Sequence, residues 1–159
     1  ETLFDHINID KKNTVVSKGT GDIGANVKEF REAIAEKTID VQLLGIGVDG
    51  HVGFNEPGRV LFDGAHVEEL DESTIDANAR FFEKRSDVPT KAISMGIGDI
   101  LRAKKLLLLA TGENKVEAMK GLLLNEELDV QNPATMVKTH PDLTVIIDRA
   151  LADQIGYRG

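Results

Sequence analysis

The stretch Leu43–Gly58, which reads LLGIGVDGHVGFNEPG, constrains the fold of this chain more than any other. It opens as a short apolar run of the kind that forms a buried strand. A loop rich in glycine follows at once and contains Asp49, His51 and Glu56. Open α/β sheets place their sites at the carboxyl ends of strands, and loops of this content carry function more often than packing. The stretch therefore predicts an α/β fold with a site directly after this strand.

Gly45, Gly47 and Gly50 have the GxGxxG spacing of dinucleotide-binding loops. In such proteins the motif opens a helix immediately after its strand. Here Gly53 and Pro57 disfavour a helix through the residues that follow. We therefore reject a dinucleotide site as the interpretation of these glycines.

Three interpretations fit the spacing of Asp49, His51 and Glu56. The first is a tight, hydrogen-bonded loop without chemistry. The second is a divalent metal site, because all three side-chain types ligate metals, although no second histidine cluster and no cysteine support it. The third is acid–base chemistry, because two carboxylates beside a histidine favour its charged form and raise its pKa.

Composition excludes several classes of function. With 159 residues the chain is expected to form one domain, and its net charge of −8 argues against non-specific nucleic-acid binding. No apolar run approaches the length of a membrane helix, and the N-terminus has no signal-peptide pattern, so no membrane partner is expected. The chain has no cysteine, which excludes disulfides and fits a cytoplasmic protein. The sequence leaves the oligomeric state open, a homo-oligomer included.

Apolar periodicity divides the chain into alternating strands and helices, which implies a parallel, layered α/β sheet. Leu3, Phe4 and Ile7 have helical spacing at the very start, as if the chain began inside an element. The expected strands are Val15–Lys18, Val41–Gly47, Ala65–Leu70, Ala92–Ile97, Leu106–Ala110 and Leu143–Ile147, and the further helices are Ala25–Lys37, Thr74–Phe82, Asp99–Ala103, Thr111–Leu124 and Arg149–Ile155.

The run GIGVDGHVGFNEPG resembles the signature of the glucosamine-6-phosphate deaminases, also called glucosamine-6-phosphate isomerases. The resemblance continues through ANARFF at Ala77–Phe82, through Gly112-x-x-Lys115 and through HPDLTVIID at His140–Asp148, and so covers nearly the whole chain. It implies a Rossmann-like parallel-sheet three-layer sandwich of the sugar-phosphate isomerase type. The Thr-Gly-Gly phosphate loop and the proton-shuttling aspartate of that family do not occur here. Residues 1–159 are therefore expected to be the C-terminal portion of a longer deaminase domain, inactive when isolated.

The resemblance implies the conversion of glucosamine 6-phosphate and water into fructose 6-phosphate and ammonia, a step of amino-sugar catabolism. It implies His51 as the acid–base group for ring opening, with Asp49 and Glu56 tuning it. Gly47 and Gly50 are expected to belong to the substrate loop. The small-molecule partner is a sugar phosphate, and neither a metal nor a cofactor is implied, since aldose–ketose isomerisation needs only positioned acids and bases.

Two cations are candidates for binding the substrate's phosphate. From the residues alone, Lys115 is either a solvated lysine or an anion-binding lysine at a strand–Gly–helix junction. Arg80 is most simply an i,i+4 partner of Asp76. The deaminase family places a phosphate-binding lysine and arginine at these two positions. The resemblance therefore assigns Lys115 and Arg80 to the phosphate, one as a point charge and one as a bidentate fork.

Two other functions remain as alternatives. A non-catalytic sugar-phosphate-binding module would keep Arg80 and Lys115 but would not need Asp49, His51 and Glu56, so the presence of these three disfavours it. A related sugar-phosphate isomerase or lactonase could use the same fold. The complete FNEPG sequence after Asp-Gly-His favours the deaminase.

Overall fold

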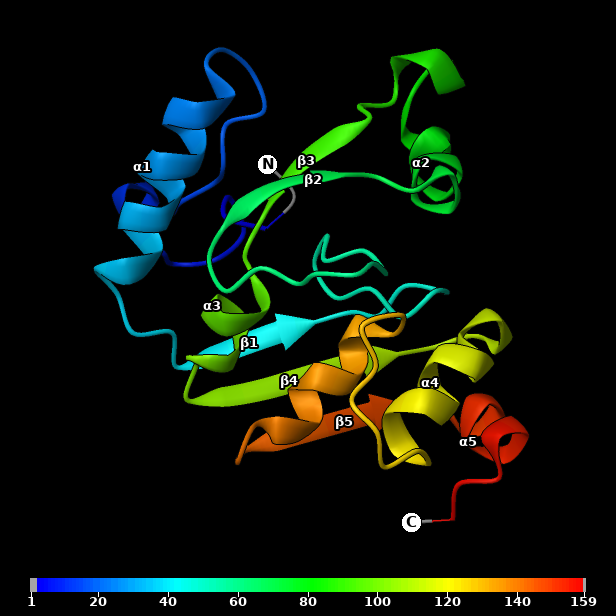
Figure 1. Ribbon diagram of the computed structural model, residues 1–159. Helices are drawn as coiled ribbons and strands as arrows, with labels where there is room; N and C mark the ends of the chain where they lie inside the picture. The colour runs from blue at the N-terminus through cyan, green and yellow to red at the C-terminus, as the bar shows by residue number, and fades with distance from the viewer. Residues whose placement is uncertain (1–2, 159) are drawn as a thin grey trace.

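The computed structural model describes residues 3–158. Its main sheet has three parallel strands in the order β1 (Val41–Leu44), β4 (Lys105–Ala110) and β5 (Leu143–Ile147). In the register of the sheet, Leu108 of the central strand lies opposite both Leu44 and Val145. The parallel α/β sheet expected from the alternation of strands and helices is confirmed (Figure 1).

Several helices begin with an aspartate that caps their first turn. Asp22 accepts a hydrogen bond from the backbone N–H of Ala25 at 3.0 Å, and Asp148 accepts one from Leu151 at 2.8 Å. Each cap satisfies an N–H group that the helix itself leaves unpaired. The α-helices are α1 (Ile23–Ala35), α2 (Glu72–Asn78), α3 (Ile97–Leu101), α4 (Val116–Leu123) and α5 (Arg149–Ile155), and the 3₁₀ helices are η1 (Lys11–Asn13), η2 (Ala79–Phe81), η3 (Arg85–Asp87), η4 (Glu113–Lys115) and η5 (Pro133–Thr139).

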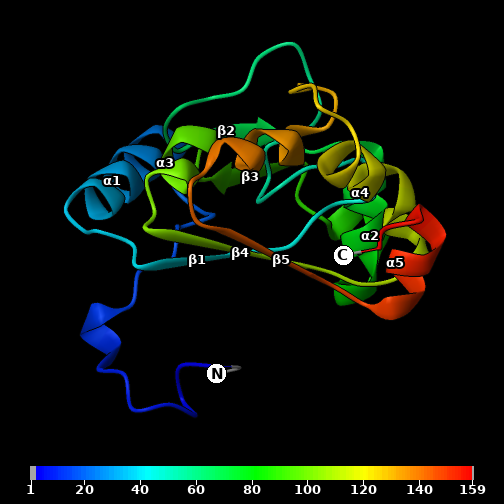
Figure 2. The same cartoon turned by 90° about the horizontal axis from the view of Figure 1, so that it is seen from below.

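The main sheet has one buried face and one exposed face. Figure 2 shows the sheet edge-on, with α1, α3 and α4 on the same side. Leu106 and Leu108 are fully buried and form a core with side chains of α3, α4, η5 and α5. The residues described here thus supply the sheet and one helical layer. On the opposite face, large apolar side chains are between 41% and 59% exposed: Val41, Leu43, Leu109 and Ile146.

Two further strands form a separate antiparallel pair, β2 (His66–Glu69) and β3 (Lys91–Ser94). They correspond to the strands expected at Ala65–Leu70 and Ala92–Ile97, so the strands are confirmed but their place in the parallel sheet is wrong. The intervening α2, η2 and η3 turn the chain back on itself, so the second strand returns alongside the first. A backbone hydrogen bond from Leu70 to Thr90, at 2.9 Å, continues the pairing.

Two expected elements near the N-terminus do not form. Residues 3–8 are turns and bends rather than a helix, with Leu3 and Ile7 exposed; a short helix is not stable without a core to pack against. The expected strand Val15–Lys18 has no partner strand, and Val16 is 73% exposed. None of the helices within residues 3–158 combines the length and the apolar content that a membrane span requires.

Two expected helices begin or end with a 3₁₀ turn. The helix predicted at Thr74–Phe82 is α-helical only as far as Asn78, and η2 follows it. The helix predicted at Thr111–Leu124 starts with η4 and becomes α-helical at Val116. Lys115 therefore occupies the capping position of α4, directly after the strand–glycine connection that leads out of β4.

Candidate active site

The loop after β1 is held tight by its own backbone. Gly47 donates to the carbonyl of His51 at 2.8 Å, and Gly50 donates to the carbonyl of Gly47 at 3.2 Å. A side chain at Gly47 would lie within 3.0 Å of both the His51 ring and the Asp49 carboxylate. Gly50 has a φ of +90°, in the left-handed region that favours glycine. These glycines thus determine the shape of the loop, and their contact with a substrate stays a prediction.

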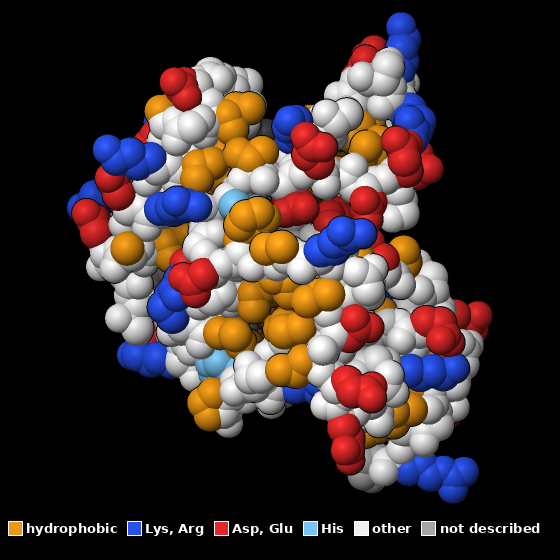
Figure 3. Space-filling view, in the orientation of Figure 1, with side chains coloured by type: hydrophobic (Ala, Val, Ile, Leu, Met, Phe, Trp, Pro, Cys, Tyr) orange, Lys and Arg blue, Asp and Glu red, His pale blue; other side chains and the backbone are white. Residues whose placement is uncertain are grey.

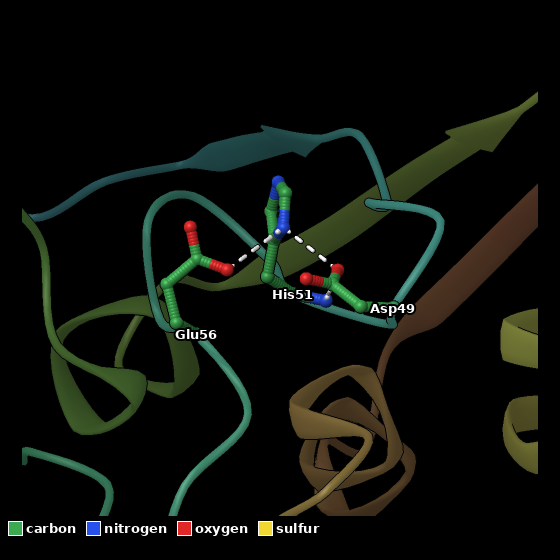
Figure 4. A group of neighbouring side chains, drawn as sticks. All are labelled: Asp49, His51 and Glu56. Atoms are coloured by element: carbon green, nitrogen blue, oxygen red, sulfur yellow. Dashed lines mark hydrogen bonds and ion pairs between the residues drawn. The ribbon is translucent and has the colours of Figure 1, made fainter. Parts of the chain in front are cut away.

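The three ionisable side chains of the loop meet at one ring nitrogen. His51 Nδ1 lies 2.8 Å from Asp49 Oδ1 and 3.2 Å from Glu56 Oε2 (Figure 4). The backbone N–H of His51 also donates to Asp49 Oδ1 at 3.1 Å. The other ring nitrogen, Nε2, points away from both carboxylates. The structure therefore brings together all three predicted catalytic residues and leaves Nε2 for chemistry.

Asp49, Glu56 and His51 each favour the charged form of the group beside them. Burial by itself would lower the pKa of His51, but its contacts with Asp49 and Glu56 outweigh burial and raise that pKa to about 9. Burial would raise the pKa of Asp49, but its contacts with His51 lower it to about 2. At neutral pH the loop thus holds an imidazolium beside a carboxylate, as the acid–base interpretation requires.

More acidic groups lie around the loop. Burial, followed by the charges of Glu56 and Asp49, raises the pKa of Asp71. Glu68 pairs with His66 at 2.9 Å; burial raises the pKa of Glu68, and His66 opposes that rise. Figure 3 shows acidic side chains gathered in the middle of this face of the molecule. An anionic ligand therefore needs a local cation to bind here.

A pocket of about 140 Å³ connects His51 with Lys115. Lys115 is half-buried and has no ion-pair partner among residues 3–158. Burial lowers its pKa, and the charge of Asp49 partly offsets that effect. The rest of the pocket is lined by Ile46, Gly47 and Val48 after β1 and by Ser73, Thr74, Ala77 and Asn78 of α2. A lysine and a charged imidazole that line the same pocket are suited to holding an anion.

Arg80 does not line this pocket. It is exposed on η2, and its guanidinium carbon lies 4.7 Å from the centre of the Phe81 ring, a cation–π contact. The pair with Asp76 that the helical spacing favours does not form, because Asp76 instead pairs with Arg85 at 2.6 Å. The 3₁₀ turn of η2 takes Arg80 out of the α-helical spacing. Its role in phosphate binding stays a prediction.

A sequence model of the family described as glucosamine-6-phosphate isomerases/6-phosphogluconolactonase matches residues 1–146. The chain belongs to this family. It is 46% identical over 157 residues to the glucosamine-6-phosphate deaminase of Clostridium beijerinckii, covering 98% of this chain and 64% of that protein. It is 52% identical over 132 residues to that of Latilactobacillus sakei, covering 82% of this chain and 55% of that protein.

Solved structures agree with this membership of the isomerase and lactonase family. A monomeric glucosamine-6-phosphate deaminase superposes with a TM-score of 0.88 at 40% identity, covering 95% of this chain and 63% of that one. The 6-phosphogluconolactonase from Trypanosoma cruzi, at 20% identity and a TM-score of 0.62, covers 87% of this chain and 54% of that one and shares the fold. The chain spans less than two thirds of the length of each of these relatives.

The same three side chains also meet the geometric requirement for a metal site. Asp49, His51 and Glu56 each offer a ligand atom, and these atoms lie within 4.8 Å of one another. A histidine must lose its proton to bind a metal, so a proton and a metal ion compete for Nδ1. The raised pKa of His51 favours the proton at neutral pH. Protonation of His51 and binding of a metal ion by these three side chains are therefore alternatives.

Sequence reasoning missed the α2 residues that line the pocket. The α2 residues in the pocket carry no motif, and only the fold brings them there. Asn55 is 1% exposed and donates from Nδ2 to the carbonyls of Val52 and Met95, at 2.8 and 2.9 Å. It thereby ties the far end of the loop to the end of β3.

His140 has a purely structural environment: its Nε2 lies 2.8 Å from the Ala103 carbonyl and its Nδ1 accepts from the backbone of Asp142.

We expect Asp49→Asn to lower the pKa of His51 from about 9 towards its ordinary value of 6.5, because one of the two neighbouring charges is lost. An NMR titration of the His51 ring in the natural full-length protein measures this pKa. The stability that charged His51 contributes is complete below pH 6.5 and is lost as the pH rises through 9. The unfolding free energy should therefore fall less steeply over this range in the variant.

Asp71→Asn is the matched control, since Asp71 influences His51 only through charge and does not contact its ring. It should shift the pKa of His51 much less than Asp49→Asn does. A His51 pKa that is the same in Asp49→Asn and in the parent would contradict the electrostatic account of the loop.

Proposed function

We propose that the protein is a glucosamine-6-phosphate deaminase, which converts glucosamine 6-phosphate and water into fructose 6-phosphate and ammonia. One observation carries the proposal: His51 contacts two carboxylates through Nδ1 and shares a pocket with Lys115, which has no ion-pair partner among residues 3–158. The deaminases of C. beijerinckii and L. sakei, at 46% and 52% identity, support a deaminase over the other activities of the family.

The arrangement of His51 suits the opening of the sugar ring. Asp49 and Glu56 keep the imidazole charged and fix its orientation, so Nε2 carries a proton into the pocket. That proton passes to the ring oxygen as the bond from C1 to the ring oxygen breaks. The C1 hydroxyl gives its own proton to water as the aldehyde forms, and His51 regains a proton from the solvent. A positioned general acid of this kind contributes typically 10²–10⁴-fold to a rate.

The later steps need a base at C2 and a water molecule. The C2 proton moves to C1 and the amine gives a proton to the aldehyde oxygen, so C1 becomes a hydroxymethyl group and C2 an imine. Water then adds to C2, and ammonia leaves to give the ketone of fructose 6-phosphate. By resemblance to the family, an aspartate outside this sequence moves the C2 proton, so residues 1–159 alone are proposed to be inactive.

Lys115 is proposed to hold the phosphate of the sugar. Lys115 lines the same pocket as His51 and lies at the start of α4, where the positive end of the helix dipole also favours an anion. Arg80 is proposed as the second cation, because η2 directly follows the α2 residues that line the pocket. The two side chains would offset the acidic surroundings of the loop.

The natural full-length protein is expected to release ammonia from glucosamine 6-phosphate in a coupled assay, and His51→Gln should lower kcat by about 10²–10⁴-fold through loss of the general acid. His6→Gln, an exposed histidine far along the chain from the loop, is the control and should leave the rate unchanged. If residues 1–159 alone turned over the substrate at the full-length rate, the proposal that they lack a residue needed for the reaction would be wrong. Hydrolysis of 6-phosphogluconolactone without release of ammonia would establish the lactonase alternative, and binding without turnover the binding module.

Lys115→Ala and Arg80→Ala should each weaken binding of the phosphorylated sugar by about 1.5–3 kcal/mol, the range for a charged hydrogen bond. The measurement is KM with glucosamine 6-phosphate compared with unphosphorylated glucosamine, on which the variants and the parent should be equally poor. Lys120→Ala is the control on α4, since Lys120 pairs with Glu117 at 2.9 Å outside the pocket. Equal losses on both sugars would show that neither residue binds the phosphate.

A further inference from the structure

Asn132, just before η5, lies behind the loop after β1 and is 9% exposed. Its Nδ2 donates to the Ala118 carbonyl in α4 at 2.9 Å. Its Oδ1 is buried and has no hydrogen-bond partner in the described part of the chain. A buried acceptor without a partner lowers stability, so the hydrogen bonding of this amide does not by itself explain its presence.

Two glycines from different elements make room for the Asn132 side chain. A Cβ at Gly50 would lie within 3.0 Å of Oδ1, and a Cβ at Gly121 would lie within 3.0 Å of Nδ2. The amide is therefore wedged between the loop and α4. The next turn of the chain holds the loop as well, because the backbone of Ala134 donates to the Gly50 carbonyl at 2.8 Å.

Asn132 lies between two elements that each hold part of the site. The loop after β1 holds His51, and Lys115 lies at the start of α4. Gly50 lies between Asp49 and His51 on the loop, and α4 begins directly after Lys115. The position of the loop on α4 therefore sets the position of His51 relative to Lys115. Asn132 itself does not line the pocket that these two side chains share.

We propose that Asn132 is a positioning residue, which fixes the loop against α4 and thereby sets His51 Nε2 relative to a phosphate held by Lys115. The inference rests on the proposed function of His51 and Lys115. Asn132 acts through its contact with Gly50 and not through contact with a substrate.

Asn132→Ala in the natural full-length protein removes the wedge and leaves Lys115 in place. We expect kcat with glucosamine 6-phosphate to fall about 10- to 100-fold, the scale of a small misplacement of a reacting group, while KM changes by less than about 2-fold. Once the loop loosens, His51 loses part of its contact with Asp49 and Glu56. Its pKa, measured by NMR, should therefore fall below that of the parent.

Lys138→Met is the matched structural control. Lys138 Nζ donates to the carbonyls of Gly121, Asn125 and Glu127 at 3.3, 2.9 and 2.7 Å, so it stabilises the end of α4 without touching Gly50. This variant should lower the midpoint of thermal unfolding while kcat and the His51 pKa stay at parental values. The same behaviour in Asn132→Ala would overturn the proposal, because it would show a purely structural role.

A double variant tests the contact directly. Gly121→Ala forces a methyl group against Asn132 and should displace the amide towards Gly50, which lowers kcat. In Gly121→Ala combined with Asn132→Ala the clash is gone, so the two losses in kcat should be clearly less than additive. Fully additive losses would contradict a shared contact. Gly121→Ala also tests the wedge if Asn132→Ala fails to fold.

The outcome for Asn132 is separable from the outcome for the proposed function. A parent protein that releases no ammonia would refute the deaminase activity. The NMR titration would still test the positioning role, since it reads the environment of His51 in the absence of substrate. A His51 pKa that Asn132→Ala leaves unchanged would overturn the inference whatever the activity.

Discussion

His51 holds Nδ1 between the carboxylates of Asp49 and Glu56, and three ionisable groups brought this close lose much of their hydration. Such a cluster is stable only if opposite charges compensate one another in fixed geometry. The surrounding chain provides that geometry. Gly47 leaves space for the two side chains that approach it, and Asn55 fixes the far end of the loop to the end of β3. The absence of a side chain at Gly47 is thus a consequence of the charge cluster that the loop carries.

The parts of the structure that sequence predicted are those with local signals. The apolar run before Gly45, the helical spacing in α1 and the order of residues from Asp49 to Glu56 each depend on neighbours in the chain. These signals predicted the sheet and the meeting of Asp49, His51 and Glu56. The antiparallel pairing of β2 with β3 and the lining of the pocket by α2 depend on contacts between distant segments. Asn132 had no signal of its own, since its importance comes from two glycines elsewhere in the chain.

The distribution of charge makes the proposed substrate site selective. The chain has a net charge of −8, and acidic side chains gather in the middle of the face in Figure 3, so the overall field opposes the approach of a free anion. Lys115 offers a positive charge inside the pocket, where partial exclusion of water strengthens its interaction with a ligand. Under the proposed function, Lys115 would hold the phosphate of the sugar while His51 acts on its ring.

The exposed face of the main sheet affects how residues 1–159 associate with one another in solution. Val41, Leu43, Leu109 and Ile146 form an apolar surface on three neighbouring strands, and β1 lies at the edge of that sheet. Surfaces of this kind adhere to one another, and strand edges add a template for further pairing. Salts that strengthen apolar association favour such adhesion. We therefore expect residues 1–159, prepared by themselves, to self-associate, and to do so more strongly in sulfate.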